Sequence, residues 1–295
     1  MKLISVLITT CTLWACIEAQ SDLVVHIEEG AIRGTTLTSL RNNRTFYAFL
    51  GIPYAEPPIG KLRFKAPQPI RPWTKIRDAT EEGNVCPQIL PESNEFVGNE
   101  NCLNLNVYTI LNETLKPVLV WFHQGAFLWR SARRKVAAPD FFMEEDVIFV
   151  STNSRLGPQG YLSLQTKEVP GNAAFKDQVL SLKWVQRNIQ HFGGDPSKVT
   201  IVGESAGGNI VHLLMLSPMS KGQKTTASQL EHHTDDPTIR IPFCPTIDKE
   251  SPRGEVFFSD TPFNLLSKGL FHKVPFLVGS NSADAIKYED GKIEL

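Results

Sequence analysis

The residues best suited to chemistry form a G-x-S-x-G motif at positions 203–207, with Ser205 at its centre. An apolar run at 199–202 predicts a short strand before the motif, and a second at 210–216 predicts a helix after it. A serine at the tip of a sharp strand-to-helix turn has a strained backbone and an exposed hydroxyl, and glycines flank it because a β-carbon there would collide with a neighbouring element. We interpret Ser205 as a candidate nucleophile. The N–H of Ala206, at the start of the helix, would face a developing oxyanion.

The composition is that of an ordinary globular protein. The chain has 295 residues, 41% of them hydrophobic and 21% charged, and a formal net charge of −1. This length is enough for one large α/β domain with a substantial core. The balanced charge gives no reason to expect a nucleic acid or an anionic membrane as a partner. We expect no cofactor and no metal.

The N-terminus has the pattern of a secretory signal. A basic start precedes an apolar run at 3–17, which is too short to span a bilayer comfortably, and we expect cleavage after Ala19. Residues 20–295 would then form a single secreted or lumenal domain with no membrane span. Two sequons, at Asn43 and Asn112, are plausible glycan sites.

Three cysteines follow the expected signal. Cys86 and Cys102 are close enough in sequence to close one surface loop in an oxidising compartment, which leaves Cys244 as an odd thiol.

The elements around the motif indicate a mostly parallel sheet. Continuous apolar runs at 118–122 and 147–151 favour strands buried on both faces. Apolar residues at spacings of three and four predict a helix over 173–192, ended by a glycine pair. Strand, helix, strand and elbow in this order imply right-handed crossovers. Three short runs predict an antiparallel N-terminal meander: 23–27, 31–37 and 45–50.

Other stretches are less regular. The basic segment 130–135 is interpreted as a solvated loop; the alternative is a binding site. Residues 217–238 are polar without an apolar period, so they form an irregular junction that is unusually long for a compact domain. We expect a helix over 263–270 and a last buried strand over 274–278.

Read together, these residues resemble the type-B carboxylesterase and cholinesterase family, insect esterases especially. The matching stretches are FLGIPYAEPP at 49–58, LRF at 62–64, ENCLNLNVY at 100–108 and the long run 171–222. The resemblance implies an α/β-hydrolase fold that cleaves small carboxylic esters through an acyl-serine intermediate.

The resemblance also assigns roles. Ser205 matches the nucleophile, and Gly125 and Ala126 match the loop positions whose N–H groups complete the oxyanion hole with Ala206. Cys86 and Cys102 match the first loop disulfide of the family. Asp284 stands where the family has the acid of the triad; the alternative is a solvated carboxylate after a strand.

The chain departs from the family pattern at several points. Gln124 replaces a glycine of the oxyanion loop, and Ser154 replaces a tyrosine. A segment of the family is missing around 222–239, and its C-terminal part, with the catalytic histidine, is absent. The family order is serine, acid, histidine, and no histidine follows Asp284. None of the histidines at 212, 232, 233 and 272 has the family's surrounding motif, and His123 reads as structural.

Three hypotheses follow. The chain is a secreted serine esterase whose activity in this form is impaired, a binding protein on the same fold without turnover, or a truncated esterase product without its own function. The intact elbow favours the first hypothesis, and the absent histidine and the interrupted C-terminal half favour the second.

Overall fold

The fold is built on an eight-stranded mixed sheet, seen in a computed structural model that describes residues 23–40, 42–111, 114–221, 225–231, 246–248 and 255–280. Its strands are β3 (Thr35–Thr38), β4 (Thr45–Pro53), β8 (Asn104–Thr109), β9 (Lys116–Phe122), β10 (Ile148–Thr152), β11 (Gly194–Glu204), β12 (Thr225–Glu231) and β13 (Phe276–Ser280). Their order across the sheet is β13-β12-β11-β9-β10-β8-β4-β3. The strands from β13 to β10 pair in parallel, and β8, β4 and β3 continue antiparallel. This is the predicted α/β-hydrolase architecture.

Two smaller sheets flank the large one. The first contains β1 (Val24–Ile27), β2 (Gly30–Arg33) and β5 (Arg77–Asp78), and the second contains β6 (Gln88–Ile89) and β7 (Phe96–Val97). The predicted N-terminal strands are present as antiparallel pairs, β1 with β2 and β3 with β4. They do not form one meander, because the chain changes sheets between β2 and β3.

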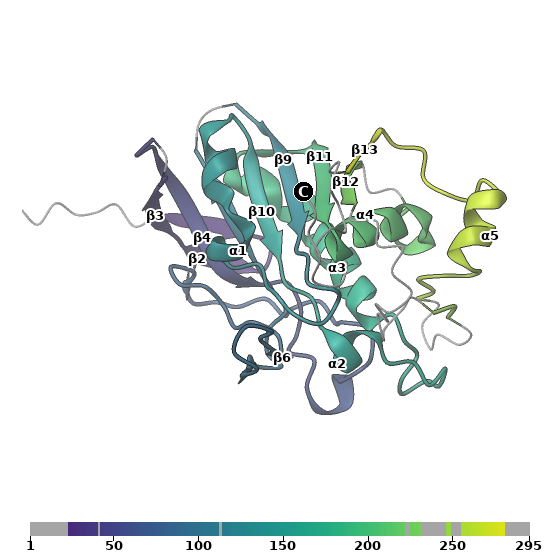
Figure 1. Ribbon diagram of the computed structural model, residues 1–295. Coiled ribbons are helices and arrows are strands. Elements are labelled where there is room, and N and C mark those ends of the chain that lie inside the picture. The colour runs from purple at the N-terminus through teal and green to yellow at the C-terminus, as the bar shows by residue number, and fades with distance from the viewer. Residues whose placement is uncertain are drawn as a thin grey trace, which may run out of the picture.

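Helices cover both faces of the large sheet (Figure 1). They are α1 (Arg134–Ala137), α2 (Gly157–Tyr161), α3 (Ala173–Asn188), α4 (Ala206–Leu216) and α5 (Pro262–Ser267), with 3₁₀ turns η1 (Gly60–Leu62), η2 (Pro139–Glu144), η3 (Ile189–Phe192) and η4 (Pro218–Ser220). Side chains alternate across β9: Val120 joins the core beneath α3 and α4, whereas Trp121 joins the smaller core beneath α1 and η2.

The predicted helix over 173–192 is confirmed, with its last turn tightened. Residues 173–188 are α-helical, and η3 completes the segment before Gly193, which has a φ of 84°. A left-handed residue at this position ends the helix and turns the chain into β11.

The segment 217–238 is not uniformly irregular, so that prediction was wrong. It contains β12, which lies in parallel register between β11 and β13. Strand formation here depends on backbone pairing with β11 and β13, which a search for an apolar period does not detect.

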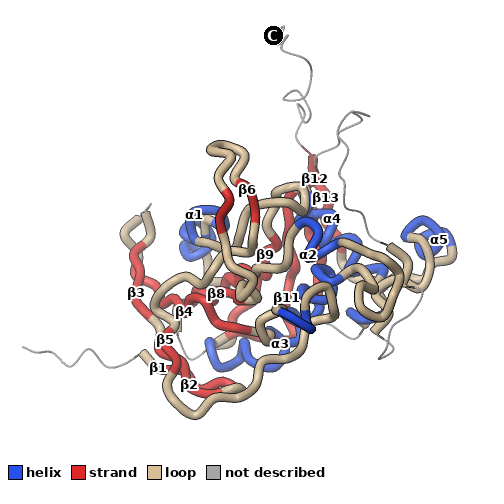
Figure 2. The backbone as a smooth tube through the Cα atoms, turned by 90° about the horizontal axis from the view of Figure 1, so that it is seen from below, coloured by secondary structure: helices blue, strands red, loops and turns tan. Residues whose placement is uncertain are grey.

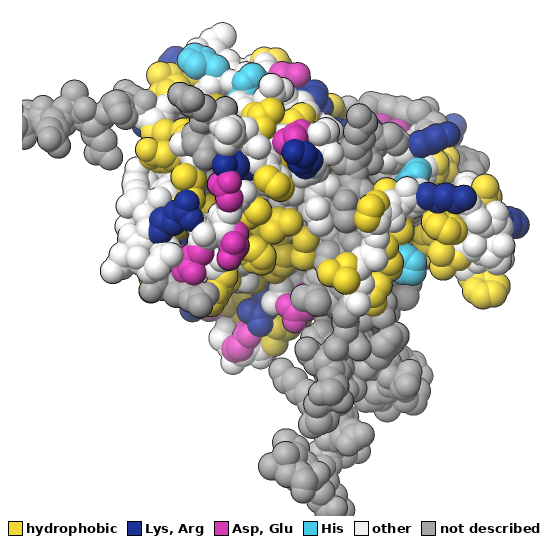
Figure 3. Space-filling model, turned by 90° about the horizontal axis from the view of Figure 1, so that it is seen from above, with side chains coloured by type: hydrophobic (Ala, Val, Ile, Leu, Met, Phe, Trp, Pro, Cys, Tyr) yellow, Lys and Arg dark blue, Asp and Glu magenta, His cyan; other side chains and the backbone are white. Residues whose placement is uncertain are grey.

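The last described strand, β13, differs in exposure from the buried strand predicted over 274–278. β13 spans 276–280 at the edge of the large sheet, and its apolar side chains are exposed: Phe276 by 40%, Leu277 by 69% and Val278 by 47%. It was predicted to be buried, but no strand in the described part of the chain covers its outer side. Hydrophobic side chains also gather over the α5 end of the molecule (Figure 3), where Phe263 is 77% exposed.

Several predictions fall outside the described residues: the signal at 1–19, Asn112, Cys244 and Asp284. Within the described ranges, no helix is long and apolar enough to cross a membrane.

Candidate active site

Ser205 lies where β11 ends and α4 begins, with a φ of 54° and a ψ of −121°. Few non-glycine residues adopt this conformation, and it costs on the order of 1–3 kcal/mol. A serine at a helix start usually accepts a hydrogen bond from the first turn, but Ser205 makes no such cap. Its half-buried hydroxyl is therefore not engaged by the helix it precedes.

The two glycines of the motif are required by close contacts. A β-carbon built at Gly203 would lie 2.2 Å from the carbonyl carbon of Gly207. One built at Gly207 would lie 2.1 Å from the carbonyl oxygen of Phe122 and 3.2 Å from that of His123. The first turn of α4 therefore lies against the end of β9, which is the reason the motif predicts for its glycines.

The loop that leaves β9 supplies the other predicted oxyanion positions. Gly125 has a φ of 117° and Ala126 a φ of 51°. The carbonyl oxygen of Gly125 accepts hydrogen bonds from the N–H groups of Leu128 (2.9 Å) and Trp129 (3.1 Å). These bonds form a tight turn. In the described part of the chain, the N–H groups of Gly125 and Ala126 donate to no backbone carbonyl. Gln124, which replaces a glycine of the family pattern, fits this loop because the left-handed conformation begins only at the next residue, Gly125.

His123 is buried between the strand and this loop. Its Nδ1 lies 2.8 Å from the carbonyl oxygen of Gln124, and its ring packs 6.4 Å from that of Trp121. Burial lowers the pKa of His123 to about 4, with a smaller contribution in the same direction from the charge of Arg130. The ring is thus neutral at pH 7 and supports the loop.

None of the described histidines is hydrogen-bonded to Ser205. His212 lies seven residues further along α4, which is about 10.5 Å along the helix axis. His272 lies at the other end of that helix, where its Nε2 is 2.8 Å from the carbonyl oxygen of Ser217. His232 and His233 lie outside the described residues.

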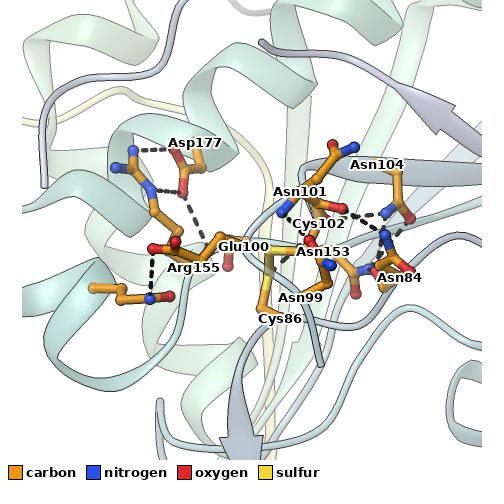
Figure 4. The surroundings of a disulfide bond; sticks show 12 residues. Asn84, Cys86, Asn99, Glu100, Asn101, Cys102, Asn104, Asn153, Arg155 and Asp177 are labelled. Atoms are coloured by element: carbon orange, nitrogen blue, oxygen red, sulfur yellow. Dashed lines mark hydrogen bonds and ion pairs between the residues drawn. A yellow bond between two sulfur atoms is a disulfide. The ribbon is translucent and has the colours of Figure 1, made fainter. Parts of the chain in front are cut away.

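The predicted disulfide between Cys86 and Cys102 is present (Figure 4). Beside it, Asn153 Nδ2 donates to the carbonyl oxygen of Asn84 (3.1 Å) and to Oδ1 of Asn104 (3.2 Å). These bonds connect the base of the disulfide loop to β8 and to the end of β10.

A buried ion pair fixes the chain after β10. Arg155 and Asp177 of α3 are 1% and 0% exposed, and the NH2 of Arg155 lies 2.5 Å from Oδ1 of Asp177. Next to it, Gln178 Nε2 donates a hydrogen bond to Oγ of Ser154 (3.0 Å). Ser154, which replaces a tyrosine of the family pattern, is therefore buried and hydrogen-bonded. Sequence reasoning missed this pair.

Taken together, a mostly parallel sheet, a strained serine at a strand-to-helix turn and a left-handed loop after the neighbouring strand define the α/β-hydrolase fold. The carboxylesterase family model matches residues 21–228. The chain belongs to the carboxylesterase family.

Individual proteins and a solved structure of this family are also similar to the chain. Venom carboxylesterase-6 of Apis mellifera is 45% identical over 200 residues, covering 65% of this chain and 35% of that protein. A carboxylic ester hydrolase of Bombus ignitus is 34% identical over 313 residues, covering 87% of this chain and 56% of that protein. A crystal structure of juvenile hormone esterase from Manduca sexta, with OTFP covalently attached, matches with a TM-score of 0.76 and 30% identity, covering 86% of this chain and 59% of that one. The chain therefore spans between about one third and three fifths of these relatives.

Proposed function

We propose that this chain carries the nucleophile and the oxyanion hole of a carboxylic ester hydrolase. Ser205 Oγ attacks the ester carbonyl and gives up its proton, and the alkoxide leaves and takes up a proton to become the alcohol. Water then attacks the acyl-serine, which releases the carboxylic acid and returns a proton to Ser205 Oγ. The N–H groups of Gly125, Ala126 and Ala206 hold the oxyanion. The observation that carries this proposal is the strained, uncapped Ser205 between two glycines that have no room for a side chain.

A serine hydroxyl needs a neighbouring base to act at neutral pH. His123 has Nδ1 beside a carbonyl oxygen and remains neutral, and His212 is two helical turns away. In a serine hydrolase, loss of the histidine alone costs roughly 10⁶ in turnover, and the oxyanion hole and binding retain roughly 10³ to 10⁴ over water. We therefore propose residual turnover for the 295-residue polypeptide. A binding protein without turnover is the second candidate, favoured because none of the histidines in the described ranges is hydrogen-bonded to Ser205.

The test is labelling of the purified chain with a fluorophosphonate, followed by intact mass, together with hydrolysis of 4-nitrophenyl acetate. The variants are Ser205→Ala and the matched control Ser267→Ala, which removes an exposed serine. We expect slow labelling at Ser205 and weak hydrolysis, both lost in Ser205→Ala and unchanged in Ser267→Ala. Equal hydrolysis by the wild type and Ser205→Ala would leave only the binding function. Fast stoichiometric labelling would show that a base is present.

The proposal includes secretion and a glycan at Asn43, which is exposed on the turn before β4. Expression in insect cells, with glycosidase treatment of the medium fraction, tests both. The wild type should lose mass on treatment, and Asn43→Gln should lose less.

A further inference from the structure

Arg130 has a backbone conformation that favours glycine. Its φ is 84°, in the left-handed region that a long side chain rarely enters. Buried Gln88 of β6 holds this conformation from both sides: its Oε1 accepts from the N–H of Arg130 (2.8 Å), and its Nε2 donates to the carbonyl oxygen of Arg130 (3.1 Å). A strained residue that its surroundings hold so firmly suggests a function for its side chain.

The side chain of Arg130 is half-buried but poorly paired. Its guanidinium carbon lies 4.3 Å from the centre of the Trp129 ring. The nearest carboxylate, on Glu92, is 4.0 Å from NH2 and 67% exposed. Nε is buried and has no hydrogen-bond partner among the described residues. A buried donor without an acceptor is destabilising, so an added acceptor would be favourable here.

Arg130 lines a cavity of about 480 Å³, within the range of small-molecule sites. The disulfide loop forms one wall of this cavity, and the stretch from Trp129 to Val136 forms the other. Figure 2 shows the β6 hairpin of that loop projecting from the body of the molecule. The cavity combines two arginines and one glutamate with an apolar lining that includes Leu90, Val97, Trp129 and Val136.

We propose that this cavity is a binding site for a small monocarboxylate with an apolar chain, and that Arg130 holds its carboxylate. The planar guanidinium of Arg130 matches a single carboxylate in two parallel hydrogen bonds. The other arginine of the lining, Arg133, already lies 4.0 Å from Oε2 of Glu82, which favours a monoanion over a dianion. The site adjoins the oxyanion loop, since a β-carbon at Gly125 would lie 3.0 Å from Cγ of Arg130. The predicted solvated loop at 130–135 is thus partly a cavity wall. This proposal does not depend on turnover at Ser205.

The test is isothermal titration with sodium hexanoate, 1-hexanol and hexylammonium chloride. We expect one-to-one binding of hexanoate and at least about tenfold weaker binding of the other two, because only the carboxylate pairs with Arg130. Arg130→Gly suits the left-handed backbone, so it should fold normally, and it should weaken hexanoate binding at least about tenfold. Arg130→Lys should be intermediate, because it keeps the charge but not the planar fork.

Two further variants locate the carboxylate. Arg71→Gln removes an arginine that is 88% exposed and should leave binding unchanged. Ser205→Ala removes a hydroxyl that lies outside this cavity, so it should also bind hexanoate as the wild type does. Weaker binding in Ser205→Ala would place the carboxylate beside the Ser205 hydroxyl and overturn the proposal. Binding by Arg130→Gly within twofold of the wild type, or no binding of hexanoate at all, would overturn it equally.

Discussion

A β-carbon at Gly207 would lie 2.1 Å from the carbonyl oxygen of Phe122, so α4 begins in direct contact with the end of β9. This contact couples the turn that holds Ser205 to the strand that leads into the oxyanion loop. Because both contacting groups are backbone, neither can move aside without displacing a strand or a helix.

Gly207→Ala should therefore lower the free energy of unfolding by roughly 3 kcal/mol or more, in the upper range for overpacking. The matched control is Gly60→Ala, which has a φ of 53° but no atom within 4 Å of the new β-carbon. It should cost only the roughly 1–2 kcal/mol of a left-handed alanine. Urea unfolding measures both, and equal losses would argue against the steric explanation.

Removing Asp177 would leave the charge of Arg155 buried. Asp177→Asn should cost roughly 3–5 kcal/mol, the usual loss when one partner of a buried pair is removed. Asp146→Asn is the control, because Asp146 pairs with Lys116 at 67% exposure and should contribute far less. Thermal and urea unfolding of both variants give the comparison. Similar small losses in both would mean that water reaches Arg155.

The buried His123 makes stability depend on pH. Burial lowers its pKa from the ordinary 6.5 to about 4, so the unfolded chain binds the proton more readily than the folded one. The contribution of neutral His123 to the free energy of unfolding is complete above pH 6.5. It is lost as the pH falls toward 4, by up to about 1.4 kcal/mol per pH unit. His123→Asn should reduce this slope, whereas His26→Gln, at an exposed position of β1, should not. Urea unfolding between pH 7 and 4.5 provides the slopes. Parallel slopes for the wild type and His123→Asn would show that His123 takes up its proton as readily in the fold as in the unfolded chain, which would contradict the lowered pKa.

The exposed edge strand β13 predicts self-association. Its exposed Leu277 lies on the outermost strand of the described sheet, where a second chain can add by strand pairing. Leu277→Lys should shift sedimentation toward the monomer at micromolar concentrations. Phe263→Lys removes a more exposed apolar side chain from α5 and should shift it less. An equal effect of the two substitutions would indicate nonspecific hydrophobic association of the surface rather than strand pairing at β13.

Much of the candidate site was determined by the sequence alone. The motif around Ser205, the helix over 173–192 and the apolar strands at 118–122 and 147–151 depend on local spacing and sterics, and all are present as predicted. The Cys86–Cys102 disulfide followed from the family resemblance. Asp284 stays a prediction.

Only the tertiary structure decided the rest. It placed β12 beside β11 and put β13 at an exposed edge, because strand pairing and burial depend on partners far away in the chain. It also placed Arg130, which the sequence predicted in a solvated loop, in the wall of a cavity. The reason is that Gln88, which holds the backbone of Arg130, comes from the disulfide loop 42 residues earlier. Such contacts have no local signature, since neither spacing nor composition near Arg130 specifies Gln88 as its partner.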